Sequence, residues 1–101
     1  MAEGKGRRKA EVARRHYRIG GRVQMVGFRA FATLHGRRLG LRGWVRNTYL
    51  GEVEAVAEGP PTELEEFEQL LRRGPESARV TSFSVLEEPP GTELDGFDPV
   101  A

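Results

Sequence analysis

Two stretches of this chain of 101 residues have the apolar spacing of a helix, and their positions most constrain the fold. The first covers residues 28–39 and is followed by Gly40, a residue type that closes helices in a left-handed conformation. The second covers residues 62–73 and begins with Thr62 and Glu65 at the spacing of a capping box. Each presents one core-facing stripe: Phe28, Phe31, Ala32, His35 and Leu39 in the first, and Leu64, Phe67, Leu70 and Leu71 in the second.

Four strand-like segments surround these two helices. Residues 16–23 alternate between polar and core-facing side chains, and residues 41–47 and 52–57 form a hairpin through a glycine-containing turn. Residues 79–86 form the fourth segment, and the changed spacing of their apolar residues predicts a β-bulge near Thr81. The order along the chain is therefore βαββαβ.

Glycines inside these elements predict local irregularities. The pair Gly20-Gly21 weakens a strand interior and indicates a bulge or a close backbone approach. Gly36 costs its helix about 1 kcal/mol relative to alanine. Either a neighbouring element packs closely against Gly36, or the helix is merely weakened there.

Both helices need a sheet to cover, and right-handed crossovers place them on the same face of it. We therefore predict an α+β fold: a ferredoxin-like βαββαβ sandwich with one antiparallel sheet covered on one face by two helices. The third strand lies between the first and the second, and Gly96-Phe97 adds a short edge segment. In this topology the end of the first strand, the start of the first helix and the end of the second strand share one edge of the sheet.

That shared edge carries the residues with the clearest chemistry. Arg29 stands at the start of the first helix and Asn47 at the end of the second strand, with about 10 Å between the two backbones. The loop of residues 24–28 leads into the helix, where backbone N–H groups and the helix dipole favour an anion. Gly27 allows close approach, and the chain has neither a Walker motif nor a GxGxxG pattern. We expect a site for a single terminal phosphoryl group.

Two motifs resemble the paired signature of the acylphosphatases, small enzymes that hydrolyse carboxyl-phosphate bonds. The pattern G-x-V-Q-G-V-x-F-R matches residues 21–29 at every defined position except Met25. The second pattern is met by Gly43-Trp44-Val45-Arg46-Asn47 and then by Gly51, Val53 and Gly59. Spacing and element order agree from about His16 to Phe97.

The resemblance implies a metal-independent acylphosphatase without a cofactor. Arg29 would anchor the phosphate and Asn47 would position the attacking water, and both are taken as catalytic residues. The family's phosphate-binding loop corresponds to Gln24, Met25, Val26, Gly27 and Phe28, which would supply backbone donors. The substrate would be a small acyl phosphate such as carbamoyl phosphate or 1,3-bisphosphoglycerate. No protein nucleophile is implied, and the bound phosphate can itself accept the proton of the water.

Met25 replaces a glycine of the family pattern, and two consequences are open. If the backbone there needs a positive φ, methionine costs about 1–2 kcal/mol. If space is what matters, the long side chain shields or narrows the mouth of the pocket. We expect activity to survive, at a reduced rate, and keep a catalytically silent domain as the other outcome.

Charge divides the chain into an arm and a body. Residues 1–18 carry seven Lys or Arg against two Glu, whereas residues 19–101 carry nine Arg against thirteen Asp or Glu. We assign residues 1–14 to a basic, disordered N-terminal arm and residues 15–101 to the acylphosphatase-like domain. The arm either keeps the protein in solution or tethers it to nucleic acid, and the first reading is favoured because no aromatic residue precedes Tyr17.

Composition excludes several other classes. The chain has no cysteine, and His16 and His35 are isolated, so we expect neither disulfides nor a metal site. Without an apolar stretch for a membrane span or a secretory signal, we expect a cytoplasmic protein. We also expect it to be a monomer. The alternative function is a non-catalytic ferredoxin-like module that binds an anion or RNA. Residues 52–57 argue against RNA, because this central strand carries two acids and no aromatic residue.

Overall fold

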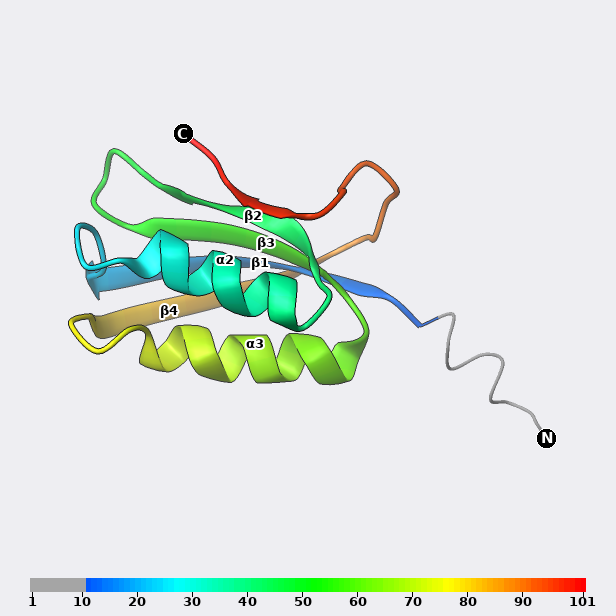
Figure 1. Cartoon of the computed structure of the whole chain (residues 1–101), viewed down its shortest axis with the longest axis horizontal. Coiled ribbons are helices and arrows are strands. Elements are labelled where there is room, and N and C mark those ends of the chain that lie inside the picture. Colours follow the sequence, from blue (N-terminus) through cyan, green and yellow to red (C-terminus); the bar gives the residue numbers. More distant parts are fainter. Residues whose placement is uncertain (1–10) are drawn as a thin grey trace.

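A computed structural model describes residues 11–101. The chain forms two helices and five strands (Figure 1). In chain order these are β1 (Ala13–Arg22), α2 (Phe28–Arg38), β2 (Arg42–Asn47), β3 (Val53–Gly59), α3 (Pro61–Arg73), β4 (Arg79–Glu88) and β5 (Phe97–Pro99). The βαββαβ order predicted from the sequence is confirmed, and β5 follows it.

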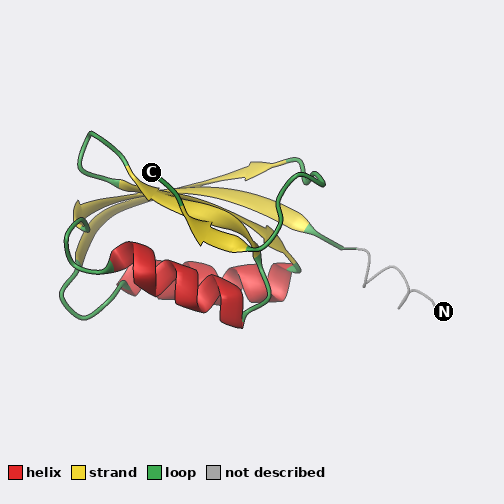
Figure 2. Cartoon of the chain, turned by 45° about the horizontal axis from the view of Figure 1, so that its top comes forward, coloured by secondary structure: helices red, strands yellow, loops and turns green. Residues whose placement is uncertain are grey.

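The strands form one sheet in the order β4-β1-β3-β2-β5, and both helices lie on the same face of it (Figure 2). As predicted, β3 lies between β1 and β2 and pairs antiparallel with each. The expectation of an antiparallel sheet is wrong at one edge, because β5 pairs parallel with β2. This three-residue strand lies on the free outer edge of β2, where the amide of Gly43 donates to the carbonyl of Gly96 over 2.8 Å.

Phe97 explains why the chain returns to that edge. Its ring is buried in the core and contacts Phe67 with the centroids 5.4 Å apart. A Cβ atom on Gly36 would lie 2.6 Å from the Phe97 ring, so α2 requires glycine there to let the ring in. Of the two readings of Gly36, close packing by a neighbouring element is the correct one.

The predicted strand irregularity lies where β1 meets β4. Gly20 pairs with Ser82 and Gly21 pairs with Val80, so Thr81 is an extra residue on β4. This confirms a bulge both at the glycine pair and near Thr81. The backbone of β4 comes so close to Gly21 that a side chain there would collide with it. Bulges of this kind bend a strand at its end, here next to the loop that leads into α2.

Two predicted boundaries differ from the structure. Helix α3 begins at Pro61, and Thr62 lies inside its first turn, where its hydroxyl donates to Glu63 rather than capping the helix. The capping-box prediction was wrong because the helix begins one residue before Thr62. Proline suits this first helical position because its φ is preset. Strand β1 begins at Ala13, two residues before the expected domain boundary, and Arg14 pairs with Glu58 in the sheet. The rest of the expected arm, residues 1–10, lies outside the described residues.

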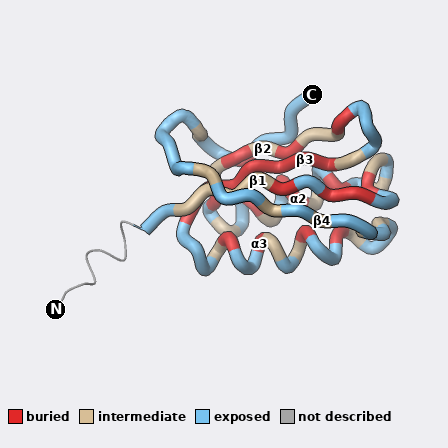
Figure 3. The backbone as a smooth tube through the Cα atoms, turned by 180° about the vertical axis from the view of Figure 1, so that it is seen from behind, coloured by how far each residue is buried: buried red, intermediate tan, exposed pale blue. Residues whose placement is uncertain are grey.

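The face of the sheet without helices is held by charged side chains. Strand β3 is buried along its whole length (Figure 3). Glu58 is 1% exposed and accepts hydrogen bonds from Arg14 and Arg42, at 2.7 and 3.0 Å. Buried carboxylates are tolerable only when paired in this way. The middle of the domain is therefore rigid on both faces of the sheet.

Candidate active site

A hollow of about 210 Å³ lies at the sheet edge where β1 ends, α2 begins and β2 ends. In Figure 1 this is the end of the sheet at which the loop before α2 and the β2–β3 turn lie. Its lining residues are Val23, Met25, Gly27, Phe28, Arg29, Ala30 and Asn47. The topology thus brings Arg29 and Asn47 to one hollow, as the sequence predicted.

Arg29 is the second residue of α2, and its side chain is exposed at the hollow. Elsewhere on the same helix, Arg37 pairs with Asp98 at 2.9 Å and Arg38 pairs with Glu66 at 3.3 Å. Within residues 11–101, by contrast, no carboxylate lies at ion-pairing distance from Arg29. Its guanidinium is therefore available to two oxygens of an anion.

The loop before α2 borders the same hollow and carries several backbone N–H groups that no acceptor in residues 11–101 takes. Met25 has φ 63° and Gly27 has φ 82°, with Val26 between them at negative φ. Such alternation turns successive N–H groups toward a common point and forms an anion-binding concavity. The first hydrogen bond of the helix runs from Phe31 N–H to the carbonyl of Gly27. In the described part of the chain no backbone or side-chain acceptor takes the N–H groups of residues 25–30, and α2 has no acidic residue in its first turn.

Met25 therefore occupies the left-handed backbone region, which decides between the two consequences considered above. The backbone at this position does need a positive φ, and a non-glycine residue there costs about 1–2 kcal/mol. The side chain is 99% exposed, so it borders the mouth of the hollow without filling it. Its N–H group still belongs to the row of free donors.

Asn47 is the last residue of β2 and pairs with Val53 on the central strand. Its side chain lines the hollow, and no hydrogen bond between described residues uses its amide. A carboxamide can donate to and accept from the same water molecule. Asn47 is thus equipped to orient a water beside an anion bound at Arg29.

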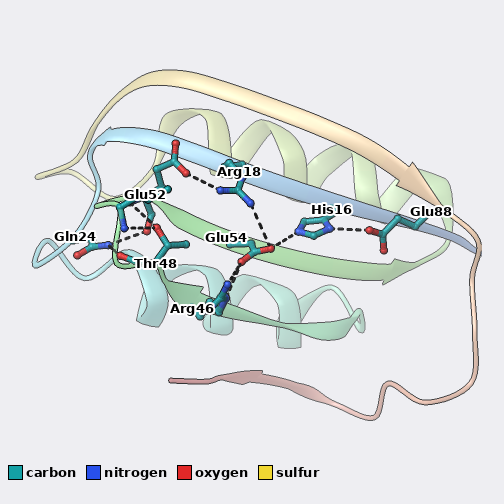
Figure 4. Close-up of polar contacts among 9 residues, drawn as sticks. His16, Arg18, Gln24, Arg46, Thr48, Glu52, Glu54 and Glu88 are labelled. Carbon is teal, nitrogen blue, oxygen red and sulfur yellow. Dashed lines mark hydrogen bonds and ion pairs between the residues drawn. The ribbon is translucent and has the colours of Figure 1, made fainter.

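The side chain of Gln24 makes contacts that the sequence did not predict. It does not line the hollow; its side-chain amide donates to the carbonyls of Thr48 and Glu52, at 2.7 and 2.9 Å (Figure 4). These bonds tie the end of β1 to the turn between β2 and β3. Gln24 therefore fixes the loop of the free amides relative to Asn47.

The hollow contains most of the predicted site and two further residues. Five of the seven predicted residues line it, while Gln24 and Val26 do not, since Val26 packs against the core. Val23 and Ala30 were missed, although Val23 continues the buried alternation of β1 and Ala30 is the next residue after Arg29. The floor is apolar, because Phe28 and Val23 are each 1% exposed.

A larger and shallower hollow, of about 420 Å³, lies on the opposite face of the sheet. Trp44, Arg46, Glu54 and Val100 line it. Arg46 and Glu54 already pair there, with Nε and Oε1 2.7 Å apart, so their charges offset each other. Trp44 lies edge-to-face with His16 rather than at the Arg29 hollow.

His16 joins three strands on that opposite face (Figure 4). Its two ring nitrogens lie 2.7 Å from a carboxylate oxygen of Glu88 and 2.5 Å from one of Glu54. Burial lowers the pKa of His16, but the hydrogen bonds to the two carboxylates outweigh it and raise the pKa above its usual value. Burial likewise raises the pKa of Glu54, and its bonds to His16 and Arg46 lower it below the usual value. This cluster stabilises the sheet and lies away from the candidate site.

Comparison with known proteins decides the family. The family model described as Acylphosphatase matches residues 15–99. The chain belongs to the acylphosphatase family. It is 51% identical over 85 residues to the acylphosphatase of Thermococcus kodakarensis, covering 83% of this chain and 91% of that protein. It is 47% identical over 88 residues to that of Anaeromyxobacter sp., covering 87% and 95%.

A solved acylphosphatase has the same fold. The crystal structure of acylphosphatase from Bacillus subtilis superposes with a TM-score of 0.85 at 35% identity, covering 88% of this chain and 99% of the other. The chain is thus an acylphosphatase, a hydrolase of acyl phosphates, with the ferredoxin-like fold. Neither helix of the described residues has the length and apolarity to span a membrane.

Proposed function

We propose that this acylphosphatase holds the phosphoryl group of a small acyl phosphate between the Arg29 guanidinium and the free amides of the loop before α2. Asn47 orients the water that attacks the phosphorus. The observation that carries this proposal concerns one hollow and the loop beside it. Among residues 11–101, they combine an arginine without an ion-pair partner, backbone N–H groups without an acceptor and a carboxamide without a hydrogen bond.

The reaction needs little beyond positioning and charge stabilisation. The water oxygen bonds to phosphorus as the bond from phosphorus to the carboxyl oxygen breaks, and the carboxylate leaves with that electron pair. One proton of the water stays on its oxygen and the other passes to a phosphoryl oxygen, which gives carboxylate and dihydrogen phosphate. Arg29 and the loop amides stabilise the charge spread over the phosphoryl oxygens, as fixed dipoles do in phosphoryl transfer.

The rigid setting supports the proposed role of Asn47. Its strand is paired to the buried β3, and Gln24 ties the opposite side of the hollow to the turn that follows Asn47. A water held between Asn47 and the bound phosphate then starts from an orientation suited to attack. All these groups come from one chain, so we also propose that a monomer suffices for activity.

Hydrolysis of benzoyl phosphate in EDTA tests the proposal. Arg29→Ala should lower kcat/KM by about 10²–10³-fold, the usual loss when a preorganised donor is removed. Asn47→Ala should lower kcat while inorganic phosphate still inhibits at the wild-type concentration. The matched control is Arg73→Ala, which removes an exposed arginine from the last turn of α3 and should change neither value.

The results of these assays distinguish an error in the assigned site from an error in the proposed activity. Full activity in both Arg29→Ala and Asn47→Ala would refute the assignment of the site. A wild type that binds phosphate without hydrolysing any acyl phosphate would refute catalysis and favour a silent binding module. Loss of activity in EDTA, recovered with a metal ion, would refute the metal-independent mechanism.

A further inference from the structure

The residues that line the hollow offer an acyl group few surfaces to contact. Asn47 and Arg29 are assigned above to the water and the phosphate. Val23 and Phe28 are buried as its floor, and Gly27 and Ala30 bring little or no side chain. Among the described lining residues, Met25 alone has a large apolar side chain open to solvent, at 99% exposure.

The direction of the reaction places the acyl group on the side of the phosphorus opposite the attacking water. In an in-line displacement, the attacking and leaving oxygens lie on opposite sides of the phosphorus. If Asn47 holds the water, the carboxylate departs from the side of the hollow away from Asn47. Met25 lines the same hollow, and its exposed side chain is open to contact with a leaving group that projects from the mouth.

The unfavourable backbone conformation of Met25 also supports a role in contacting the acyl group. Its φ of 63° is unfavourable for a side-chain-bearing residue, and its exposure shows that no buried contact within the domain compensates. A flexible thioether side chain at the mouth of a pocket can adapt to apolar groups of various shapes. Contact with a bound acyl group would give this side chain apolar burial that the free protein lacks.

We propose that Met25 is a specificity residue, and that this enzyme prefers acyl phosphates with an apolar acyl group, aliphatic or aromatic, over acetyl or highly polar ones. The inference rests on the function proposed above. It narrows the substrate class, because an acyl chain of several carbons reaches Met25 at the mouth while an acetyl group stays near the phosphate.

Acetyl, butanoyl and hexanoyl phosphate form the decisive substrate series. Their carboxylate leaving groups have nearly equal acidity, so a change of kcat/KM along the series reports contacts of the chain and not chemical reactivity. A fully buried methylene is worth about fourfold in affinity, and one covered on a single side about twofold. We expect the hexanoyl to acetyl ratio of kcat/KM to be about three- to tenfold in the wild type, allowing for partial contact.

Two substitutions at Met25 and one control isolate the side chain. Met25→Gln keeps the length and the backbone strain but is polar, and should bring the hexanoyl to acetyl ratio close to one. Met25→Leu should retain most of the ratio. Tyr49→Ser removes another large side chain, 98% exposed on the neighbouring turn but outside the hollow, and should leave the ratio unchanged.

Each result bears on a different claim. Equal ratios in the wild type and Met25→Gln, with acyl phosphates still hydrolysed, would overturn the role of Met25 and leave the proposed function standing. A ratio that collapses in Tyr49→Ser while Met25→Gln keeps it would place the acyl group on the other loop and overturn the inference. No hydrolysis of any member of the series would overturn both proposals together.

Discussion

Replacing Met25 by glycine should leave the domain as stable as the wild type or stabilise it, although glycine at an ordinary surface position is destabilising. The left-handed conformation at φ 63° costs a non-glycine residue about 1–2 kcal/mol, which glycine removes. Glycine adds about 0.4–1 kcal/mol of unfolded-chain entropy. Because Met25 is almost fully exposed, no burial is lost. The free energy of unfolding should therefore rise by about 0–1.5 kcal/mol.

Urea denaturation of Met25→Gly beside Leu50→Gly measures this effect. Leu50 is exposed on the neighbouring turn and is not among the positive-φ residues, so glycine there should lose at least about 0.5–1 kcal/mol. Met25→Ala keeps both a Cβ atom and the strain, and should remain near the wild type. For a domain of this size each 1 kcal/mol corresponds to a shift in Tm of about 4–8 °C.

The comparison of the two glycine variants is what can refute the reasoning. If Met25→Gly loses as much stability as Leu50→Gly, with equal urea m-values, the backbone at Met25 is not strained. A gain confined to Met25→Gly would confirm that the loop maintains an unfavourable conformation.

Three further changes test the packing and the polar contacts. Gly36→Ala should lower the free energy of unfolding by about 1–2 kcal/mol, because overpacking against Phe97 exceeds the gain in helix propensity. Thermal denaturation measures this loss of stability, with Leu34→Ala at an exposed position of the same helix as the control. Because the pKa of His16 is raised in the folded protein, the stabilisation of the fold by protonated His16 is complete below the unfolded pKa of about 6.5. This stabilisation is lost as the pH rises through the folded pKa. His16→Gln should remove this pH dependence from urea unfolding curves recorded between about pH 5.5 and 9. Gln24→Ala should destabilise by about 0.5–1.5 kcal/mol in urea unfolding, because its two side-chain hydrogen bonds are lost while each carbonyl keeps a backbone donor. It should also lower kcat, and a wild-type kcat would contradict its role as a tether.

The arrangement of the main elements could be predicted because each has local signals. The helical stripe ending at Gly40 and the alternation around Tyr17 specify element types, and crossover handedness then places Arg29 and Asn47 at one edge. The register shift at Gly20-Gly21 was also visible, since both partner strands carry irregular spacing. These features depend on neighbouring residues in the sequence or on a general rule of topology.

The parts that were not predicted depend on distant residues. The place of β5 at the edge of β2 depends on the fit of the Phe97 ring against Gly36, 61 positions earlier in the chain. The task of Gln24 follows from carbonyls on the β2–β3 turn, which no local pattern reveals. Glu54 and Glu58 look like exposed alternating acids in the sequence, but arginines from adjacent strands bury them.

The buried central strand and the strained loop are connected through few contacts. Strand β3 is buried on both faces (Figure 3). Asn47 is paired to this strand through Val53. Gln24 extends this rigid body to the loop before α2, where Met25 is held at positive φ next to the free amides. Strained backbone persists only where the surroundings determine it more strongly than local preference. Under the proposed mechanism, the donors of the hollow are therefore oriented before phosphate binds, and binding and attack require little reorganisation of the protein.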